Sequence, residues 1–449
     1  MPATLTTEPA SRRFGLRWKH DLWGPQPEWT CEPDVAAVRA IAARYVSEPT
    51  VTPLGGGAFN KLYTVASCSR PHADLVFRVT LPVEPRYKTA SEVATIRYVA
   101  RRTRIPVPAV IAYDCAADNE LSFEWILMEK VPGVCYAEAA QGPAMPMEAK
   151  QAVARAVAGH VLEMRERCRL SRIGSLYQRC DLTEAELAAT APTELEDIVI
   201  GPAVTMFMLL GPLRMLITRD RGPYRTDYDF VSAQLDAQIK DNELLRVIAT
   251  GGDAGVPYNP SDHGDDGYDS DTVEDAAEVA EGLQALRSVL PSLFATADPP
   301  QSSPMPDLPF VLRHPDLNHS NILLDPATNT ITAIIDWECT ISGPKWDDTY
   351  PAFIDGADRL EQPPQPDAGD NDDLRAEQWE EWEKTQLRHA FDQVAVARTS
   401  ADYESEAKHL FLMQMNAAGL SGKMVVSWVE KLKQLMSSGW QGMEELLYN

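Results

Sequence analysis

Apolar residues follow two different patterns along the chain. In residues 51–131 they form short runs of branched and aromatic side chains, which predict strands, with one helical repeat over Lys88–Arg102 between them. Beyond residue 132 the apolar positions mostly recur three or four residues apart, which predicts helices. We therefore expect an α+β protein with its sheet in the N-terminal part and most of its helices in the C-terminal part.

The boundaries of the elements follow from the same patterns. The predicted strands include Leu75–Val79, Val110–Ala112, Phe123–Met128 and Ile173–Tyr177. The other predicted helices are Asp34–Tyr45, Pro146–Cys168, Asp227–Ile248, Glu274–Leu293, Arg375–Arg398, Tyr403–Met415 and Lys423–Met436. Residues 1–30 contain four prolines and are predicted as an irregular arm.

A β-hairpin is predicted within the C-terminal part. The apolar runs Ile322–Leu324 and Ile331–Ile335 have strand composition, and the Asp-Pro-Ala-Thr-Asn-Thr segment between them has turn chemistry. In an antiparallel hairpin the residue that opens the first strand lies beside the one that closes the second. Asn321 and Asp336 should therefore meet in space.

These two residues, with Asp316 five positions before Asn321, carry the candidate chemistry. An amide oxygen and a carboxylate can hold a hard cation such as Mg²⁺. A nearby carboxylate can accept the proton of an attacking hydroxyl. Together these are the groups that phosphoryl transfer requires. The alternative is a hairpin with a polar rim and no chemistry.

The segment His314-Pro315-Asp316-Leu317-Asn318-His319-Ser320-Asn321 resembles the H-x-D-x-x-x-x-N catalytic loop of the kinase-like fold. Ile335-Asp336-Trp337-Glu338 is similar to the I-D-[WF]-E motif of the aminoglycoside phosphotransferase family. The resemblance implies a bilobal protein-kinase-like fold, with a small antiparallel sheet plus one helix at 31–131 and a larger, mainly helical lobe at 132–449. It also implies transfer of a phosphoryl group from ATP to a small-molecule hydroxyl, with Asp316 catalytic and Asn321 and Asp336 holding Mg²⁺.

Two backbone segments of the small lobe resemble the nucleotide-binding elements of that family. Gly55, Gly56 and Gly57 precede a predicted strand, and glycine lets backbone amides approach a phosphate closely. A flexible turn is the other interpretation of three glycines. The run ending in Met-Glu-Lys-Val-Pro-Gly resembles the hinge, where the resemblance implies that backbone groups near Glu129 and Val131 bind the adenine edge.

Arg78 stands where the family resemblance implies a phosphate-binding lysine. Arginine keeps the charge but differs in reach and in its planar geometry. The Val-Phe-Arg-Val form also resembles fungal-type members of the family. Glu92, on the predicted helix, matches the glutamate that pairs with this cation, so an Arg78–Glu92 ion pair is expected; a solvated surface carboxylate is the alternative.

Composition narrows the range of partners. The formal net charge is -25 over 449 residues, which argues against nucleic acid as a partner. No apolar run approaches the ~20 residues that a membrane helix needs. Seven scattered cysteines without a C-x-x-C spacing indicate reduced thiols, and no secretory signal is visible, so we expect a cytoplasmic protein. Arg12, Arg13 and Arg17 faintly resemble a mitochondrial transit peptide.

Two segments and two other functions stay open at this point. Ile198–Arg225 is interpreted either as a substrate-shaping lid or as a connector, and the acidic residues 250–275 are predicted as a disordered loop. The replacement of lysine by Arg78 leaves open a pseudokinase that binds nucleotide without turnover. A metal-dependent hydrolase using His314, Asp316, His319 and Asp336 is the third hypothesis. The acceptor and the oligomeric state do not follow from the sequence.

Overall fold

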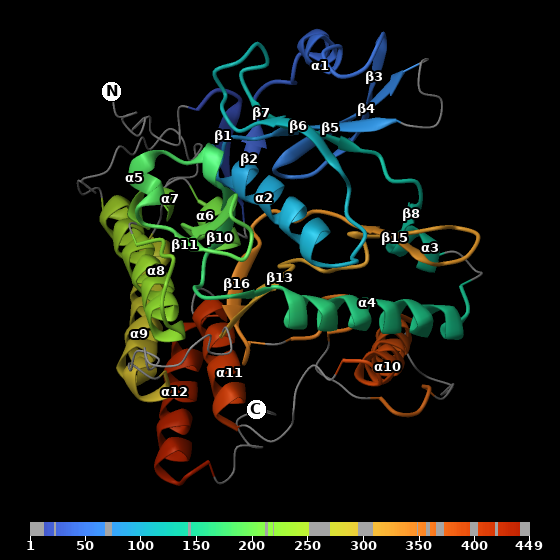
Figure 1. The fold of residues 1–449 in the computed structure, drawn as a ribbon. Coiled ribbons are helices and arrows are strands. Elements are labelled where there is room, and N and C mark those ends of the chain that lie inside the picture. The colour runs from blue at the N-terminus through green and yellow to red at the C-terminus, as the bar shows by residue number, and fades with distance from the viewer. Residues whose placement is uncertain are drawn as a thin grey trace.

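The computed structural model describes residues 13–21, 24–67, 74–141, 145–211, 214–218, 220–250, 270–294, 309–347, 349–355, 360–364, 372–395, 403–417 and 421–440. A sheet-rich N-terminal part lies above a larger, mainly helical C-terminal part (Figure 1). The α+β class and the bilobal kinase-like fold expected from the sequence are confirmed.

The N-terminal part is built on a five-stranded antiparallel sheet in the order β3-β4-β5-β7-β6. Its strands are β3 (Pro49–Gly56), β4 (Asn60–Ser67), β5 (Leu75–Thr80), β6 (Val110–Asp114) and β7 (Glu124–Glu129). Side chains alternate between the two faces of a strand. Phe77 and Val79 therefore join the core beneath α1 (Val35–Ala42), and Arg78 points to the opposite face.

The second face of this sheet is covered by α2 (Tyr87–Arg102). The helix is also packed against β10 (Ser175–Gln178), so it has neighbours on several sides. Every residue from Lys88 to Ile96 is buried, including the charged Lys88 and Glu92. Because charged side chains are almost never fully buried unless they are paired, Lys88 and Glu92 must have partners on the elements packed around this helix.

The C-terminal part begins with β8 (Val134–Cys135), α3 (Tyr136–Gln141) and α4 (Met147–Arg167). Strand β13 (Phe310–Arg313) pairs with β16 (Ile341–Pro344) and β9 (Arg169–Leu170), and the hairpin β14 (Ile322–Leu324) and β15 (Ile331–Ile334) pairs with β8. Ile322, Ile334 and Trp337 pack in one core with residues of α2, α4 and α10 (Asp372–Asp392). The predicted hairpin is thus seated directly on the main core.

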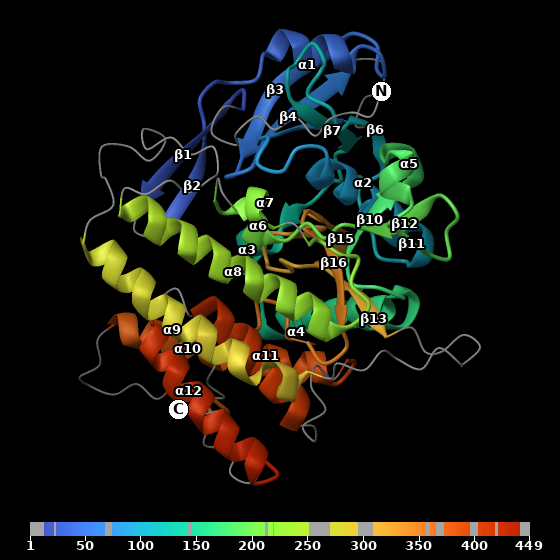
Figure 2. The ribbon, with the colours of Figure 1, turned by 90° about the vertical axis from the view of Figure 1, so that its left-hand side faces the viewer.

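A second hydrophobic core joins four helices away from the hairpin. These are α8 (Asp227–Ala249), α9 (Ser270–Leu293), α11 (Tyr403–Ala417) and α12 (Gly422–Ser437). Figure 2 shows α8 and α9 running side by side. Helices α9 and α12 cross so closely that a Cβ added at Gly422 would lie 1.8 Å from the Glu278 carbonyl oxygen. Glycine is required there because only its lack of a side chain permits this approach.

The segment between α4 and α8 packs on both parts of the molecule. Its short elements are η2 (Arg179–Asp181), α5 (Glu184–Leu187), β11 (Ala191–Pro192), β12 (Ile198–Gly201), α6 (Met206–Leu209) and α7 (Arg214–Ile217). Ile198 and Ile200 lie in the main core. Arg221 pairs with Glu84 of the N-terminal part at 2.9 Å. Within Ile198–Arg225 these contacts favour a packed connector.

Two sequence predictions are wrong. The arm at 1–30 is not irregular in its described part, because β1 (Leu16–Asp21) and β2 (Gly24–Trp29) form an antiparallel hairpin, with the prolines of β2 on a two-stranded sheet that has no central strand. The predicted disordered loop 250–275 extends too far, since α9 begins at Ser270; acidic residues, which suggested a loop, are also favoured in the first turn of a helix. Residues 251–269 lie outside the described residues. Within the described chain, no helix is long and apolar enough to cross a membrane.

Candidate active site

The hairpin β14–β15 places Asn321 and Asp336 at the same end, as predicted. Ile322 pairs with Ile334, and the Ile335 N–H donates to the Asn321 carbonyl oxygen at 3.0 Å. Asp336 then takes a left-handed backbone conformation with φ 65°. Aspartate tolerates this region better than most residues. The buried Trp337 holds the segment in place, since its indole N–H donates to the Ile334 carbonyl oxygen at 3.0 Å.

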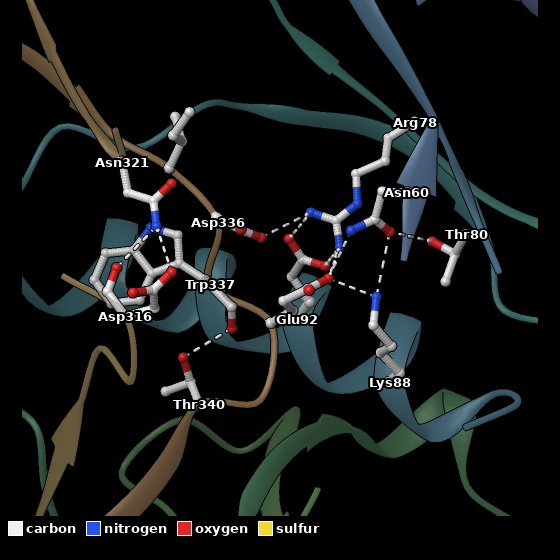
Figure 3. Close-up of polar contacts among 12 residues, drawn as sticks. Asn60, Arg78, Thr80, Lys88, Glu92, Asp316, Asn321, Asp336, Trp337 and Thr340 are labelled. Atoms are coloured by element: carbon white, nitrogen blue, oxygen red, sulfur yellow. Dashed lines mark hydrogen bonds and ion pairs between the residues drawn. The ribbon is translucent and has the colours of Figure 1, made fainter. Parts of the chain in front are cut away.

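Asp316 is held beside Asn321 by hydrogen bonds within the loop (Figure 3). The Asn321 amide nitrogen donates to the Asp316 carbonyl oxygen at 2.8 Å and to its carboxylate at 3.1 Å. The Asn318 amide nitrogen donates to the other carboxylate oxygen of Asp316 at 2.8 Å. In Figure 3 the amide oxygen of Asn321 points away from Asp316. The loop therefore presents an exposed carboxylate and, beside it, an amide oxygen.

His314 supports this loop from beneath. Its buried ring donates from Nε2 to the Ile335 carbonyl oxygen at 2.9 Å, and Nδ1 accepts the Asp316 N–H at 3.2 Å. These two contacts define a neutral ring, and burial lowers the pKa of His314 to about 4. Both ring nitrogens are occupied, so the ring can act neither as a base nor as a metal ligand in this arrangement. This removes one residue from the hydrolase hypothesis.

The expected Arg78–Glu92 ion pair is present and buried. Arg78 Nη1 donates to Glu92 Oε1 at 2.6 Å, and Arg78 Nη2 donates to Glu92 Oε2. Arg78 also contacts Glu338 at 2.7 Å and Asp336 at 3.4 Å. Burial alone would lower the pKa of Arg78, but these three carboxylates raise it, so the guanidinium stays charged.

Three residues of this site were not predicted. They are Asn60, Lys88 and Glu338, and they join Arg78 and Glu92 in one buried network. Burial raises the pKa of Glu338, but Lys88 and Arg78 outweigh it and lower that pKa to about 2. The sequence did hold signals, because Glu338 ends the Ile-Asp-Trp-Glu motif and Lys88 precedes Glu92 by one helical turn. It could not show that a lysine on a predicted helix is fully buried.

The glycine turn follows β3, and the segment compared with the hinge follows β7. Gly55 and Gly56 end β3, and the Gly57 N–H donates to the Asn60 carbonyl oxygen at 2.9 Å. In the segment compared with the hinge, the Glu129 N–H donates a hydrogen bond to the Ala109 carbonyl oxygen at 2.9 Å. The Val131 N–H makes no hydrogen bond to any residue that the structure describes.

The donor set at the end of the hairpin fits magnesium. Asn321 offers an amide oxygen, because its nitrogen is already directed to Asp316, and Asp336 offers a carboxylate. Burial and the neighbouring Glu338 carboxylate raise the pKa of Asp336, although Arg78 and Lys88 act in the opposite direction. Two oxygen ligands suffice in a site where Mg²⁺ takes its remaining ligands from phosphates and water. The arrangement can hold a metal beside the exposed Asp316 carboxylate.

This fold and loop geometry define a kinase-like protein of the phosphotransferase type. The model of the phosphotransferase enzyme family (APH) matches residues 50–204 and 258–388, more than half of the chain. The chain therefore belongs to the phosphotransferase enzyme family.

Curated relatives and solved structures give more distant similarities. The chain is 28% identical over 332 residues to a subtelomeric hrmA-associated cluster protein of Aspergillus fumigatus, covering 68% of this chain and 60% of that protein. It is 24% identical over 315 residues to the altered inheritance of mitochondria protein 9 of Clavispora lusitaniae, covering 66% and 49%. The chain thus spans about half to 60% of these relatives.

Among solved structures, aminoglycoside phosphotransferase APH(4)-Ia with ADP and hygromycin B has a TM-score of 0.41 at 14% identity, covering 92% of this chain and 98% of that one. The amicoumacin kinase hAmiN has a TM-score of 0.43 at 14% identity, covering 88% and 86%. The family assignment rests on the match to the phosphotransferase family model.

Proposed function

We propose that this protein is an ATP-dependent phosphotransferase that acts on a hydroxyl group of a small molecule. The observation that carries the proposal is the hairpin end, where Asp316, Asn321 and Asp336 stand together although the first and the last are 20 positions apart. Phosphoryl transfer needs mainly positioning and charge stabilisation, and this cluster supplies groups for both.

Asp316 orients the acceptor hydroxyl and accepts its proton. Its carboxylate is exposed, and the amides of Asn318 and Asn321 fix its orientation. An ionised carboxylate can serve as the proton acceptor once the hydroxyl lies within hydrogen-bond reach. His314 keeps the loop in shape and exchanges no proton with the substrate.

Asn321 and Asp336 would hold Mg²⁺, which would offset the charge of the nucleotide phosphates. Gly55, Gly56 and Gly57 cover the phosphates, and backbone groups near Glu129 and Val131 bind the adenine edge. Arg78 lies on the phosphate side of the site and is fixed by Glu92. Its 3.4 Å contact with Asp336 is the longest of its carboxylate contacts, so it is the one that a phosphate oxygen replaces most readily.

The test is an ATP-consumption screen over hydroxyl-bearing compounds, including antibiotics, amine-bearing metabolites, choline-like compounds and sugar alcohols, with product mass as the readout. The matched control is Asp316→Asn. Phosphorylated product that disappears in this variant supports the proposal. Nucleotide binding without Asp316-dependent turnover would instead assign a pseudokinase, and turnover without nucleotide would assign a hydrolase.

A further inference from the structure

One carboxylate oxygen ties the glycine turn to the segment that follows the hairpin. Glu338 Oε2 accepts hydrogen bonds from Lys88 Nζ at 2.5 Å, from an Arg78 terminal nitrogen at 2.7 Å and from the Asn60 side-chain amide at 2.9 Å. The donors belong to α2, β5 and β4, and Glu338 belongs to the C-terminal part. This point therefore joins the two parts of the molecule.

Asn60 links Glu338 to the glycine turn, because its side chain binds Glu338 and its backbone binds Gly57. Its amide oxygen accepts from Lys88 Nζ at 3.2 Å and from the Thr80 hydroxyl at 3.3 Å, while its amide nitrogen is bound to Glu338. Figure 3 shows Asn60 between Arg78 and Thr80, with Lys88 beneath. Its carbonyl oxygen accepts the Gly57 N–H at 2.9 Å. Fixing the Asn60 side chain therefore fixes the closing end of the turn.

Lys88 is the least expected member of this network. It is 0% exposed, and besides its two hydrogen bonds its ammonium lies 5.8 Å from the centre of the Phe59 ring. A buried ammonium is costly unless it is paired and hydrogen-bonded. Glu338 provides the negative charge that pairs with the Lys88 ammonium, and the Asn60 amide oxygen provides a second hydrogen-bond acceptor. The lysine is thus placed where it contacts both the tip of the turn and the C-terminal segment.

The charges of the network explain why both cations are needed. Arg78 and Lys88 face three carboxylates, those of Glu92, Asp336 and Glu338. Without Lys88, a single cation would face all three. The repulsion between Glu338 and Asp336 would then be compensated by one cation fewer. The contact between the glycine turn and the segment around Glu338 would weaken as a result.

We propose that Lys88, Glu338 and Asn60 form a latch that holds the glycine turn against the Asp336 segment, and that Lys88 is a positioning residue for nucleotide binding. Lys88 acts through Asn60 and Glu338 and does not itself contact the nucleotide. The second part of this inference rests on the proposed function, whereas the latch itself does not.

The experiment combines hydrogen–deuterium exchange with titration of a non-hydrolysable Mg-ATP analogue, using the full chain. Asn60→Ala removes the tie without leaving a buried charge unpaired, and Lys88→Met removes the charge at similar length. We expect exchange at residues 55–61 to rise about tenfold or more in both variants. We also expect the dissociation constant of the analogue to rise about tenfold, equivalent to ~1.4 kcal/mol.

Two further variants separate the latch from general damage. Lys150→Met removes a positive charge from α4, where the lysine pairs with Glu383 at 2.7 Å away from the network, and should leave both readouts unchanged. The double variant Lys88→Met with Glu338→Gln removes one charge of each sign. It should recover part of the affinity lost in Lys88→Met, because a removed ion pair leaves no unpaired charge. A purely steric role of Lys88 predicts no such recovery.

Each outcome decides one part of the inference. Unchanged exchange at 55–61 in Asn60→Ala and Lys88→Met overturns the latch, and if Lys88→Met does not fold, Asn60→Ala decides alone. Faster exchange with unchanged analogue affinity overturns the positioning role. An unaltered protein that fails to bind the analogue, while the variants still exchange faster, overturns the proposed function and leaves the latch in place.

Discussion

Asp336 stands between two regions that hold the site together in different ways. On one side lies the candidate catalytic loop, where His314, Asp316 and Asn321 are hydrogen-bonded to residues at most 21 positions away. On the other side lies the buried charge network, in which Arg78 and Lys88 reach Glu338 across 260 and 250 positions. The first region consists of local hydrogen bonds, whereas the second combines one pair 14 positions apart, Arg78–Glu92, with long-range ion pairs to Glu338.

The two regions differ in burial, and therefore in what a substitution is expected to change. The Asp316 carboxylate is exposed and could be changed with little loss of packing, since exposed groups lose little on substitution. The charges of the network are buried, and removing one partner of a buried pair leaves the other uncompensated. Substitutions in the loop should therefore affect turnover, and substitutions in the network should affect folding together with nucleotide binding.

The largest effect is expected for Asp316→Asn. Loss of the proton acceptor should lower kcat by about 10²–10⁴, which is the usual contribution of general base catalysis. Thermal stability and nucleotide affinity should stay close to those of the unaltered protein. Steady-state kinetics on the first active substrate, together with calorimetric binding, would measure both.

Asp325→Asn is the matched control, because Asp325 is an exposed carboxylate at the far end of the same hairpin that accepts the Ala327 and Thr328 N–H groups. It should retain full kcat. If Asp316→Asn lowered stability as much as turnover, the proposed separation between the two regions would be wrong.

The next effect is expected for Glu92→Gln. The substitution keeps the shape of the side chain but leaves Arg78 without its bidentate partner, which should destabilise the fold by about 3–5 kcal/mol. The apparent nucleotide constant should rise sharply in the same variant. Denaturant unfolding and nucleotide titration are the measurements. Glu166→Gln, an exposed position on α4, should change stability by less than ~0.5 kcal/mol; equal effects of the two variants would refute a buried ion pair.

A smaller effect, dependent on pH, is expected for His314. Its pKa is about 4 in the fold and 6.5 in the unfolded chain, so the fold favours the neutral ring. The stabilisation is complete above pH 6.5 and is lost as the pH falls towards 4, because the unfolded chain then binds the proton more readily. Between pH 7.5 and 5 the loss amounts to about 2 kcal/mol. The His314→Gln variant should lack this pH-dependent loss of stability. The free energy of unfolding of both proteins would be measured from pH 7.5 to 5, and equal pH dependence in the two would contradict the prediction.

The same contrast explains how much of the structure followed from the sequence. The hairpin was predictable because its strands, turn and flanking polar residues are contiguous, and hydrophobic pattern and turn chemistry are local signals. The Arg78–Glu92 pair followed from the family resemblance, because a strand and the next helix bring residues 14 positions apart together.

Lys88, Asn60 and Glu338 did not follow, because their meeting depends on how the two parts of the molecule pack. Position along a helix does not show that α2 is enclosed on several sides, so a buried lysine appears as a surface residue. The N-terminal hairpin was missed for a related reason. Its prolines predict irregular backbone, yet prolines are tolerated in a strand that is not central in a sheet.

The smallest effect on stability and affinity is expected for Gly57→Ala, which tests whether the glycine turn binds a nucleotide. A Cβ at Gly57 would meet no atom within 4 Å, and its φ is not positive, so the fold itself does not require glycine there. The substitution should change the free energy of unfolding by less than ~1 kcal/mol, and in the stabilising direction, because alanine restricts the unfolded chain. Nucleotide affinity should nevertheless fall severalfold, since the methyl group occupies the space through which a phosphate approaches the backbone. Gly439→Ala, at a position with φ 68° in the C-terminal part, should show the reverse, with lower stability and unchanged affinity. If both variants lost stability and neither lost affinity, the glycine turn would be a structural element only, and the nucleotide would have to be covered by another segment.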